Sequence, residues 1–350
     1  MRWRTTVCSF LLLAYGFDIR PAVARFEFSE THMGTRFRIV VYSNTARAAN
    51  LASSAAFERI GKLDAIMSDY RTTSELMVLC KRPSGTKVTV SEDLFRVLGT
   101  AQDLSARSEG AFDVTVGTVV RLWRRARRTG ELPDRQEIVR ALDSSGYTRL
   151  SLDRASRSVS LEKSGMLLDL GGIAKGYAAD EAMKVLKRHG IRRALVAAGG
   201  DIVVSSPPPG ARGWLIGIAP LESTEQQPTR YLWLRDRAVS TSGDAHQYVE
   251  IAGVRYSHIV DPRTGLALTG HRSVTVVANS CTTSDGLSTA ASVLGPSEGS
   301  RLIDSVAGAS ALFAQAGDNG TLNVETTRWK QIPKPPQRRP ADPVDENLRD

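Results

Sequence analysis

The sequence predicts an α+β or mixed α/β fold, with antiparallel sheets and flanking helices. First, stretches with strand-like and helical spacing follow one another without the strict alternation of a parallel α/β fold. Second, several short strand-like stretches follow one another between residues 214 and 251, which is typical of an antiparallel sheet. Third, the 350 residues are 41% hydrophobic and 24% charged, so the chain can bury a substantial core.

The first 24 residues predict a secretory signal peptide. Residues 1–4 carry positive charge, residues 7–17 form a short apolar run, and Ala22-Val23-Ala24 offers a small-residue cleavage site. The run is too short to span a bilayer stably. The alternative is a buried N-terminal helix. The signal predicts a mature protein that starts near Arg25 in the periplasm, with association with the inner membrane left open.

The next segments predict a hairpin and three helices. Residues 26–41 favour a strand pair that turns at Met33-Gly34-Thr35. Residues 46–67 have helical spacing with an apolar stripe. Residues 91–108 form a second helix, because Ser91 can cap it and acids occupy its first turn. Residues 135–142 form a third.

The rest of the chain predicts a mixture of strands and helices. Gly190 ends a helix over residues 177–189, as glycine commonly does. The expected strands cover residues 150–152, 158–161, 166–169, 194–198, 214–219, 231–234, 238–242, 248–251, 273–278 and 309–315. Two further helices are expected at 284–294 and 299–307. Residues 25–330 thus form the folded domain, and the proline-rich tail 331–350 is expected to be disordered.

Charge and cysteine content limit the classes of partner. The net charge is +9, and many of the basic residues lie in VVRLWRRARRTG, residues 119–130. We interpret this cluster, Arg121 to Arg128, as a solvated helix face. The alternative is a docking surface for an acidic partner or an anionic membrane. No nucleic-acid motif accompanies it. Cys80 and Cys281 could form one disulfide, but Cys281 is expected to be a small packing residue.

The stretch LDLGGIAKGYAAD, residues 168–180, predicts a nucleotide site. Gly171 and Gly172 let a backbone approach a ligand closely, and a helix that starts just afterwards offers unpaired N–H groups to an anion. Lys175 adds a point charge suited to phosphate. Asp169 could accept hydrogen bonds from a ring or a ribose. The alternative is a glycine turn that only packs against its surroundings.

Two further motifs suggest a metal site and a proton acceptor. In NSCTTSDGLSTAASVLG, Asp285 and Thr289 are one helical turn apart and Ser288 is beside them, which gives hard oxygen ligands of the kind Mg²⁺ favours. The alternative for Asp285 is an acid that complements the helix dipole. In RYSHIVDPRTG, His258 ends a strand and could act as an acid/base. The alternative is a hydrogen-bonded structural histidine.

The order of the motifs resembles the ApbE family, the FAD:protein FMN transferases. The resemblance covers about residues 28–324 and rests on MGT, YRTTSEL, GAFDVTVG, LDLGGIAKGYAAD, AAGGDI, AVSTSGD, YSHIVDPRTG and SDGLSTAASVLG. It implies a two-part, T-fold-related α/β architecture. It also implies an enzyme that cleaves FAD at its pyrophosphate with Mg²⁺, moves FMN onto a Thr or Ser hydroxyl of a target protein, and releases AMP.

The resemblance also implies partners and residue roles. The acceptor would be an FMN-carrying protein domain like those of sodium-pumping quinone reductases, Rnf-type complexes and related regulators of nitrous oxide reduction. His258 would be the acid/base. Mg²⁺ would be held by the carbonyl of Gly172 and the side chains of Asp285 and Thr289, with Ser288 nearby. The FAD contacts would be Met33, Tyr70, Ala111, Phe112, Asp113, Asp169, Lys175 and Ile259.

Three departures from the family pattern qualify these roles. Val114 stands where members commonly have proline, and arginines follow Leu122-Trp123 where members often have glycine and aromatic residues. The arginine region could contact the acceptor. Ser288 stands where some members place an acid, so the metal site would have one ligand fewer. Two other functions stay open: a Mg²⁺-dependent FAD pyrophosphatase that gives FMN and AMP, and a non-catalytic periplasmic flavin-binding protein, against which the proposed metal ligands and proton acceptor argue.

Overall fold

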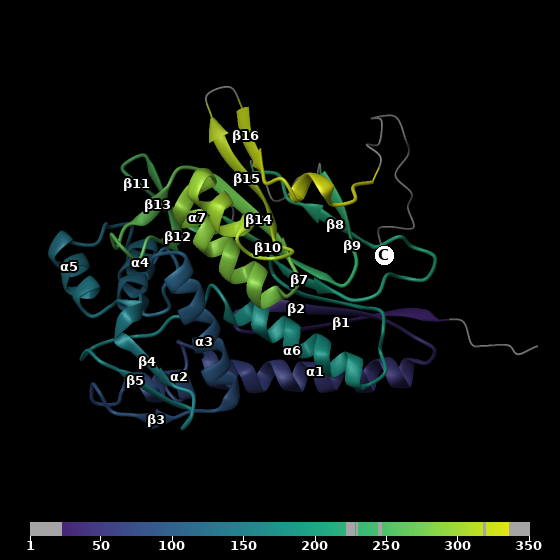
Figure 1. The fold of residues 1–350 in the computed structure, drawn as a ribbon, viewed down its shortest axis with the longest axis horizontal. Helices are drawn as coiled ribbons and strands as arrows, with labels where there is room; N and C mark the ends of the chain where they lie inside the picture. The colour runs from purple at the N-terminus through teal and green to yellow at the C-terminus, as the bar shows by residue number, and fades with distance from the viewer. Residues whose placement is uncertain (1–22, 222–227, 229, 244–246, 318–319, 336–350) are drawn as a thin grey trace, which may run out of the picture.

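A central antiparallel sheet of eight strands organises the molecule (Figure 1). The computed structural model describes residues 23–221, 228, 230–243, 247–317 and 320–335. The strand order in the sheet is β1-β2-β6-β7-β10-β14-β15-β16. These strands are β1 Ala24–His32, β2 Thr35–Ser43, β6 Ala194–Ala198, β7 Asp201–Val204, β10 Arg237–Gly243, β14 Arg272–Ala278, β15 Ser310–Gly317 and β16 Gly320–Glu325. The predicted α+β class with antiparallel sheets is confirmed.

The turn between β1 and β2 forms as the sequence predicts. Met33 and Gly34 both have positive φ angles, 48° and 71°. Two consecutive residues with positive φ make the tight hairpin turn whose twist matches that of the paired strands. The turn therefore holds the Met33 backbone at the end of the sheet.

Three long helices cover one face of the sheet (Figure 1). They are α1 Ala46–Met67, α6 Ala174–Arg188 and α7 Cys281–Asp304. The side chain of Thr45 caps α1 by accepting a hydrogen bond from Ala48 N. Alternate strand residues such as Ile39 and Val196 point into the main core beneath these helices.

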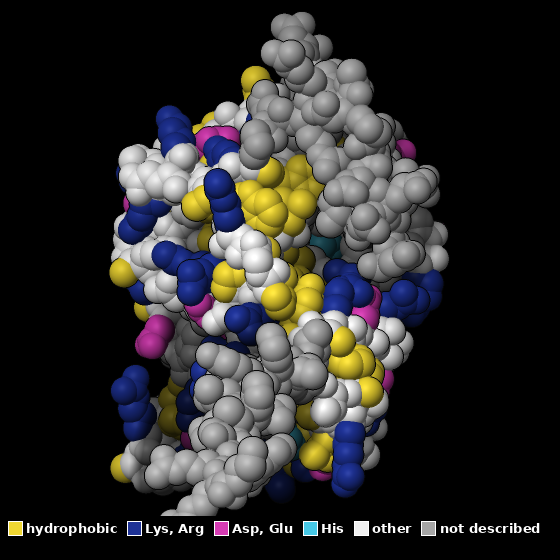
Figure 2. All heavy atoms as spheres, turned by 90° about the vertical axis from the view of Figure 1, so that its right-hand side faces the viewer, with side chains coloured by type: hydrophobic (Ala, Val, Ile, Leu, Met, Phe, Trp, Pro, Cys, Tyr) yellow, Lys and Arg dark blue, Asp and Glu magenta, His cyan; other side chains and the backbone are white. Residues whose placement is uncertain are grey.

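The opposite face of the sheet has its own smaller core. Two strands, β8 Trp214–Ile218 and β9 Arg230–Leu234, pair with each other and pack against it. The short helix η2 Trp329–Gln331 adds Trp329, which is buried. Figure 2 shows the side of the molecule where β8 and β9 lie; lysine and arginine side chains are scattered there among apolar ones and do not form one basic surface.

Smaller elements at one end of the sheet complete the fold (Figure 1). The helices are α2 Glu75–Cys80, α3 Glu92–Arg107, α4 Gly117–Thr129, α5 Arg135–Asp143 and η1 Tyr147–Arg149. One three-stranded sheet joins β3 Val88–Thr89, β5 Ser158–Leu161 and β4 Leu150–Asp153. The other joins β11 Tyr248–Ile251, β12 Val254–Val260 and β13 Ala267–Thr269.

One predicted strand differs in the structure, and one predicted break between helices is present. The strand expected at 166–169 is wrong: only an isolated bridge between Leu167 and Val116 forms there, because the segment passes beside the start of α4 instead of joining a sheet. The break expected between the helices at 284–294 and 299–307 is confirmed, because α7 consists of two helical parts that are separated at Gly295, where φ is 73°, before Pro296. This glycine conformation redirects the chain between the two parts.

The signal peptide lies almost entirely outside the described residues, as do residues 336–350 of the predicted tail. Residues 331–335 continue beside β9, where Trp233 N donates a hydrogen bond to Pro333 O. Cys80 and Cys281 are free thiols, and Cys281 is fully buried as predicted for a packing residue. In the described part of the chain, no helix has the length and apolar character to span a membrane.

Candidate active site

One cavity of about 1110 Å³ collects almost all of the residues that the sequence singled out. Its walls come from the β1–β2 turn, the loop after α1, the segments before α4 and α6, the strands β10 and β12, and α7. The volume slightly exceeds the roughly 300–1,000 Å³ of ordinary small-molecule pockets, so a dinucleotide can fit. The predicted residues that line it are Met33, Tyr70, Ala111, Phe112, Asp113, Asp169, Gly172, Lys175, His258, Ile259, Asp285 and Thr289.

The start of α6 brings a lysine to the cavity. The helix begins at Ala174, three residues before the predicted start, so Lys175 lies in its first turn. Lys175 Nζ donates to Asp201 Oδ2 at 2.6 Å and lies 3.9 Å from Asp285 Oδ2. Burial lowers the pKa of Lys175, but the two carboxylates outweigh burial and hold that pKa above its usual value. Lys175 is therefore a fixed positive charge.

The helices α6 and α7 cap each other through two carboxylates. Asp285 of α7 accepts a hydrogen bond from Gly176 N in the first turn of α6, at 3.0 Å. Asp180 of α6 accepts from Cys281 N and Thr282 N at the start of α7, both at 2.8 Å. Each helix thus satisfies N–H groups at the start of the other that would otherwise be orphaned. This arrangement fixes the position of Asp285.

The environment of Asp285 shifts the pKa of its side chain. Burial raises the pKa of Asp285 to about 7, the nearby Asp201 adds to the rise, and the Lys175 ammonium offsets part of it. Burial thus disfavours the charged form of this carboxylate, and a nearby cation favours it. Asp285 Oδ1 takes no hydrogen bond from any of the described residues, and Asp285 lines the cavity.

The oxygen donors at this point fit a small divalent cation. A Cβ built on Gly172 would lie 3.0 Å from Thr289 Oγ1, so the Gly172 backbone and the Thr289 hydroxyl are neighbours. Asp285 is one turn from Thr289 on α7. The described residues contain no group of three His, Cys, Asp or Glu side chains that could hold a metal. One carboxylate, one hydroxyl and one carbonyl instead match Mg²⁺, which usually keeps several waters and substrate phosphates as ligands.

An arginine organises the acidic side of the cavity. Arg124 of α4 donates to Asp169 Oδ2 at 2.7 Å and also bonds Asp69. Its guanidinium carbon lies 4.5 Å from the centre of the Tyr70 ring, whose side chain is 75% exposed. Burial raises the pKa of Asp169, and Arg124 opposes that rise. Tyr70 therefore presents a ring, backed by a cation, that is open to stack on an aromatic ligand.

The loop before α4 supplies a buried wall. Ala111 and Phe112 are almost fully buried, and the Phe112 ring touches the place where a Gly172 side chain would be. Asp113 accepts hydrogen bonds from Thr115 N and Oγ1, each at 2.7 Å. Burial raises the pKa of Asp113. Its carboxylate thus holds the loop in shape.

His258 lies on β12, far from the other motifs in sequence, and lines the same cavity. Its Nδ1 lies 3.1 Å from Gln247 O, and its backbone N donates to the same carbonyl at 3.0 Å. A carbonyl accepts only, so Nδ1 carries the proton and Nε2 is the basic nitrogen. The adjacent Ile259 is buried at the cavity wall.

Ser288 is the one predicted site residue that does not line the cavity. It is fully buried, its hydroxyl donates to Asp285 O at 2.9 Å, and it lies 2.7 Å from Ser242 Oγ. Ser242 in turn lies 3.4 Å from Thr289 Oγ1. Ser288 is thus linked to Thr289 through the hydroxyl of Ser242 and does not face the cavity.

Comparison with known proteins agrees with this geometry. The sequence profile of the ApbE family matches residues 33–313, which is most of the chain. The chain belongs to the ApbE family. A relative from Treponema pallidum named FAD:protein FMN transferase is 32% identical over 89% of this chain and 90% of its own length. This relative thus matches the chain across nearly its whole length.

Solved ApbE structures share the fold. The flavin transferase ApbE from Vibrio cholerae superposes with a TM-score of 0.81 and 28% identity, covering 89% of this chain and 99% of that one. The ApbE protein from Thermotoga maritima gives a TM-score of 0.79 and 31% identity, covering 90% and 100%. The architecture described above is therefore the ApbE architecture.

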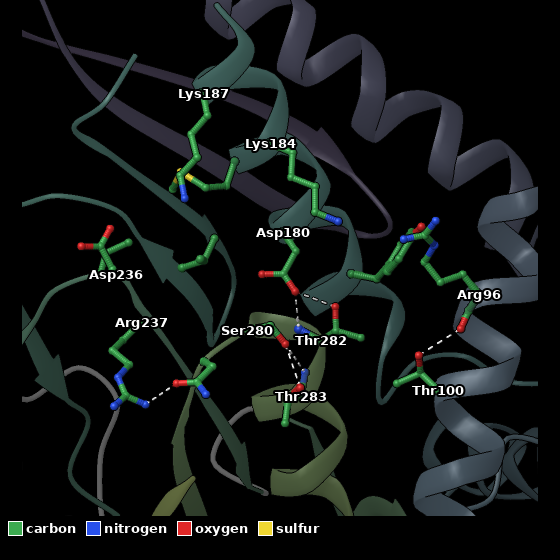
Figure 3. A pocket seen from close by; sticks show the side chains of 15 residues that line it. Arg96, Thr100, Asp180, Lys184, Lys187, Asp236, Arg237, Ser280, Thr282 and Thr283 are labelled. Carbon is green, nitrogen blue, oxygen red and sulfur yellow. Dashed lines mark hydrogen bonds between the residues drawn. The ribbon is translucent and has the colours of Figure 1, made fainter. Parts of the chain in front are cut away.

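A second, smaller cavity of about 390 Å³ lies on the other side of α6 (Figure 3). Figure 3 shows Asp180 turned toward Thr282 and Ser280 toward Thr283, at the start of α7. The hydrogen bonds of Asp180 and Ser280 already satisfy the N–H groups there. This cavity marks the cap that holds α7 and not a second part of the ApbE site.

The arginine cluster requires a correction. It is not simply a solvated helix face, because Arg124 and Arg127 line the main cavity together with Val120. These positions are i, i+4 and i+7, which fall on one face of a helix. Arg121, Arg125 and Arg128 are exposed, as the interpretation expected. The departure from the ApbE pattern noted in the sequence therefore reaches the cavity itself.

Several cavity residues carried no predicted role. Asp201 pairs with Lys175, and Asp69 pairs with Arg124. The sequence did contain a signal for Asp201, because this residue directly follows the two glycines of the quoted motif AAGGDI. Gln247, which bonds His258, had no signal in the sequence, since only the fold brings it to the site.

Proposed function

We propose that this chain is a Mg²⁺-dependent FAD:protein FMN transferase. It would attach the FMN part of FAD to a Thr or Ser hydroxyl of a target flavoprotein and release AMP. The observation that carries the proposal is the meeting of a cation-binding set, a fixed lysine and a histidine on one cavity of dinucleotide size. The names of the ApbE relatives, FAD:protein FMN transferase, support the substrate and the reaction class.

The cavity has separate places for the parts of FAD. Lys175, in the first turn of α6, provides positive charge for a phosphate. Tyr70, with 75% of its side chain exposed, offers a stacking surface for a ring system. The buried Phe112 and Ile259 give the apolar contact that a flavin or adenine ring needs. A dinucleotide is the ligand that uses all three.

The residues have distinct roles in the proposed transfer. Gly172, Asp285 and Thr289 would hold Mg²⁺, which when bound neutralises charge on the pyrophosphate. Lys175 stabilises negative charge on the phosphate oxygens because it stays protonated. His258, with Nδ1 directed to Gln247 O, presents Nε2 to accept the proton of the acceptor hydroxyl.

The location and partners follow from the same proposal. Residues 1–24 would direct export to the periplasm, and the enzyme would act there on exported FAD and on an acceptor domain of the kind carried by sodium-pumping quinone reductases or Rnf-type complexes. Fusion of residues 1–24 to a reporter that is active only after export tests the location. A reporter that stays inactive contradicts it.

An in vitro flavinylation assay tests the function. The protein is incubated with FAD, Mg²⁺ and an FMN-acceptor domain, and the denatured acceptor is examined for flavin fluorescence while AMP is measured. A labelled acceptor and equal AMP support the transferase. Free FMN and AMP without a labelled band would show a pyrophosphatase, and intact bound FAD would show a flavin carrier.

Paired variants assign the roles. Asp285→Ala is expected to abolish turnover, whereas Glu298→Gln, an exposed acid on the same helix, keeps it. His258→Ala is expected to lose transfer and retain FAD binding, whereas His189→Ala, exposed at the end of α6, keeps transfer. Full activity of the Asp285 variant contradicts the cation site, and full activity of the His258 variant removes its proton role.

A further inference from the structure

The charges on the cavity wall are almost all paired. Lys175 pairs with Asp201, and Arg124 with Asp69 and Asp169. Arg71 lies 3.3 Å from Asp64. In each case a carboxylate of the protein balances the cation. These cations therefore hold the wall together as well as facing the ligand.

Arg127 is the exception. It lines the cavity, is half-buried, and its only hydrogen bond to the described residues is a long one, from Nη1 to Gln247 Oε1 at 3.4 Å. No carboxylate of the described residues lies within 4.0 Å of it. Burial and the neighbouring Arg124 lower the pKa of Arg127, and Tyr70 and Asp169 offset only part of this effect. A half-buried guanidinium of this kind favours an incoming anion.

The position of Arg127 indicates which anion it would bind. Gln247 contacts Arg127 through its side chain and His258 through its backbone carbonyl. Gln247 thus links Arg127 to the proposed proton acceptor, which the target hydroxyl must reach. The pyrophosphate of FAD is served by Lys175 at the start of α6. The anion near Arg127 is therefore expected to come with the acceptor.

We propose that Arg127 is a specificity-determining contact for an acidic side chain of the acceptor protein. This inference rests on the proposed transferase function. An extended peptide advances about 3.3 Å per residue, so the acidic residue stands within a few positions of the modified Thr or Ser. The guanidinium fork binds a carboxylate with two hydrogen bonds and thereby helps to set the register of the peptide against His258.

A membrane surface does not fit this position. Arg127 lies inside the hollow with Arg124 and Val120, and a flat bilayer cannot bring a headgroup there. A peptide segment that delivers a hydroxyl to His258 must enter the same hollow. The exposed Arg121, Arg125 and Arg128 face away from this lining and carry no part of the proposal.

A binding experiment tests the inference directly. The test uses an acceptor domain chosen for an Asp within a few residues of its target Thr, and the Thr is replaced by Ala so that no transfer occurs. Its affinity for the full-length mature protein with FAD is measured by calorimetry. Arg127→Glu and Arg127→Gln are each expected to weaken binding by about tenfold or more. Replacement of the acceptor Asp by Lys should restore binding to Arg127→Glu and weaken binding to the wild type.

Controls separate the outcomes. Arg128→Glu, exposed on the same helix, should bind the acceptor like the wild type. Unchanged acceptor affinity in both Arg127 variants overturns the inference. Weaker FAD binding with unchanged acceptor binding, read from flavin fluorescence, also overturns it and assigns Arg127 to FAD. Because this acceptor cannot be modified, a failure of the wild type to label a normal acceptor would contradict the proposed function alone.

Discussion

Substitution of Gly176 by alanine should separate α6 from α7 and destabilise the protein. A Cβ at this position would lie 2.3 Å from Cys281 O, 2.7 Å from Cys281 C and 2.8 Å from Asp285 Cβ. These atoms are backbone or Cβ atoms of α7, so no side-chain rotation can relieve the contact. Since real Cβ contacts essentially never fall below 3.0 Å, the helices must move apart by at least about 0.7 Å.

The energetic cost can be worked from this movement. Overpacking of a core typically costs about 1–3 kcal/mol. The same movement lengthens the 3.0 Å hydrogen bond from Gly176 N to Asp285 beyond the normal range, and a hydrogen bond to a charged group contributes about 1.5–3 kcal/mol. We therefore expect the free energy of unfolding to fall by about 3–5 kcal/mol.

Chemical denaturation followed by tryptophan fluorescence measures this change. Gly99 of α3 provides a matched control, because nothing lies within 4 Å of a Cβ built there. Gly99→Ala should raise stability by about 0.4–1 kcal/mol, since alanine restricts the unfolded chain. If Gly176→Ala were as stable as the wild type within about 1 kcal/mol, the tight α6–α7 contact and the position of Asp285 derived from it would be refuted.

Three further predictions concern the charged residues around the site. Asp180→Ala removes the three hydrogen bonds that cap α7 and should lower the free energy of unfolding by about 1–2 kcal/mol; an unchanged denaturation midpoint contradicts the capping role. The raised pKa of Asp285, from 3.8 to about 7, stabilises the metal-free protein below pH 4, and that contribution is lost as the pH rises to 7. The melting temperature of the wild type should therefore fall relative to that of Asp285→Asn between pH 4 and 7, and parallel curves would contradict the raised pKa. Arg124→Met should lower the free energy of unfolding by about 3–5 kcal/mol, because it leaves Asp69 and Asp169 without their shared cation. Arg125→Met breaks an exposed pair with Glu137 and should cost about 1 kcal/mol or less, so equal losses in the two variants would contradict the assigned burial of Arg124.

Elements with a strong local signal were predictable from the sequence. The helix at residues 46–67 matches α1, because its apolar stripe is long and Thr45 caps it. The turn at Met33-Gly34 and the cap at Ser91 also depend on local chemistry. The segment at residues 166–169 has the apolar character of a strand, but its partners are loop and helix backbone, which no local pattern reveals.

The candidate site shows the same division. Motifs placed Lys175, Asp285 and Thr289 on the cavity, because each lies at a helix start or on one helix face. The pairing of Arg124 with Asp69 and Asp169 joins residues distant in sequence, so composition alone suggested a solvated surface. The spacing of Arg124 and Arg127 was the available signal, since three residues on a helix return to the same side.

The mutual capping of α6 and α7 has a consequence for how the protein can diversify. Neither helix has a complete N-terminus unless its partner is docked, so the two behave as one cooperative block during folding and local opening. The amides of Gly176 and Cys281 should consequently lose their protection from hydrogen exchange together. Substitutions that reshape the cavity are then best tolerated in the surrounding walls, such as α4, while this block keeps its geometry.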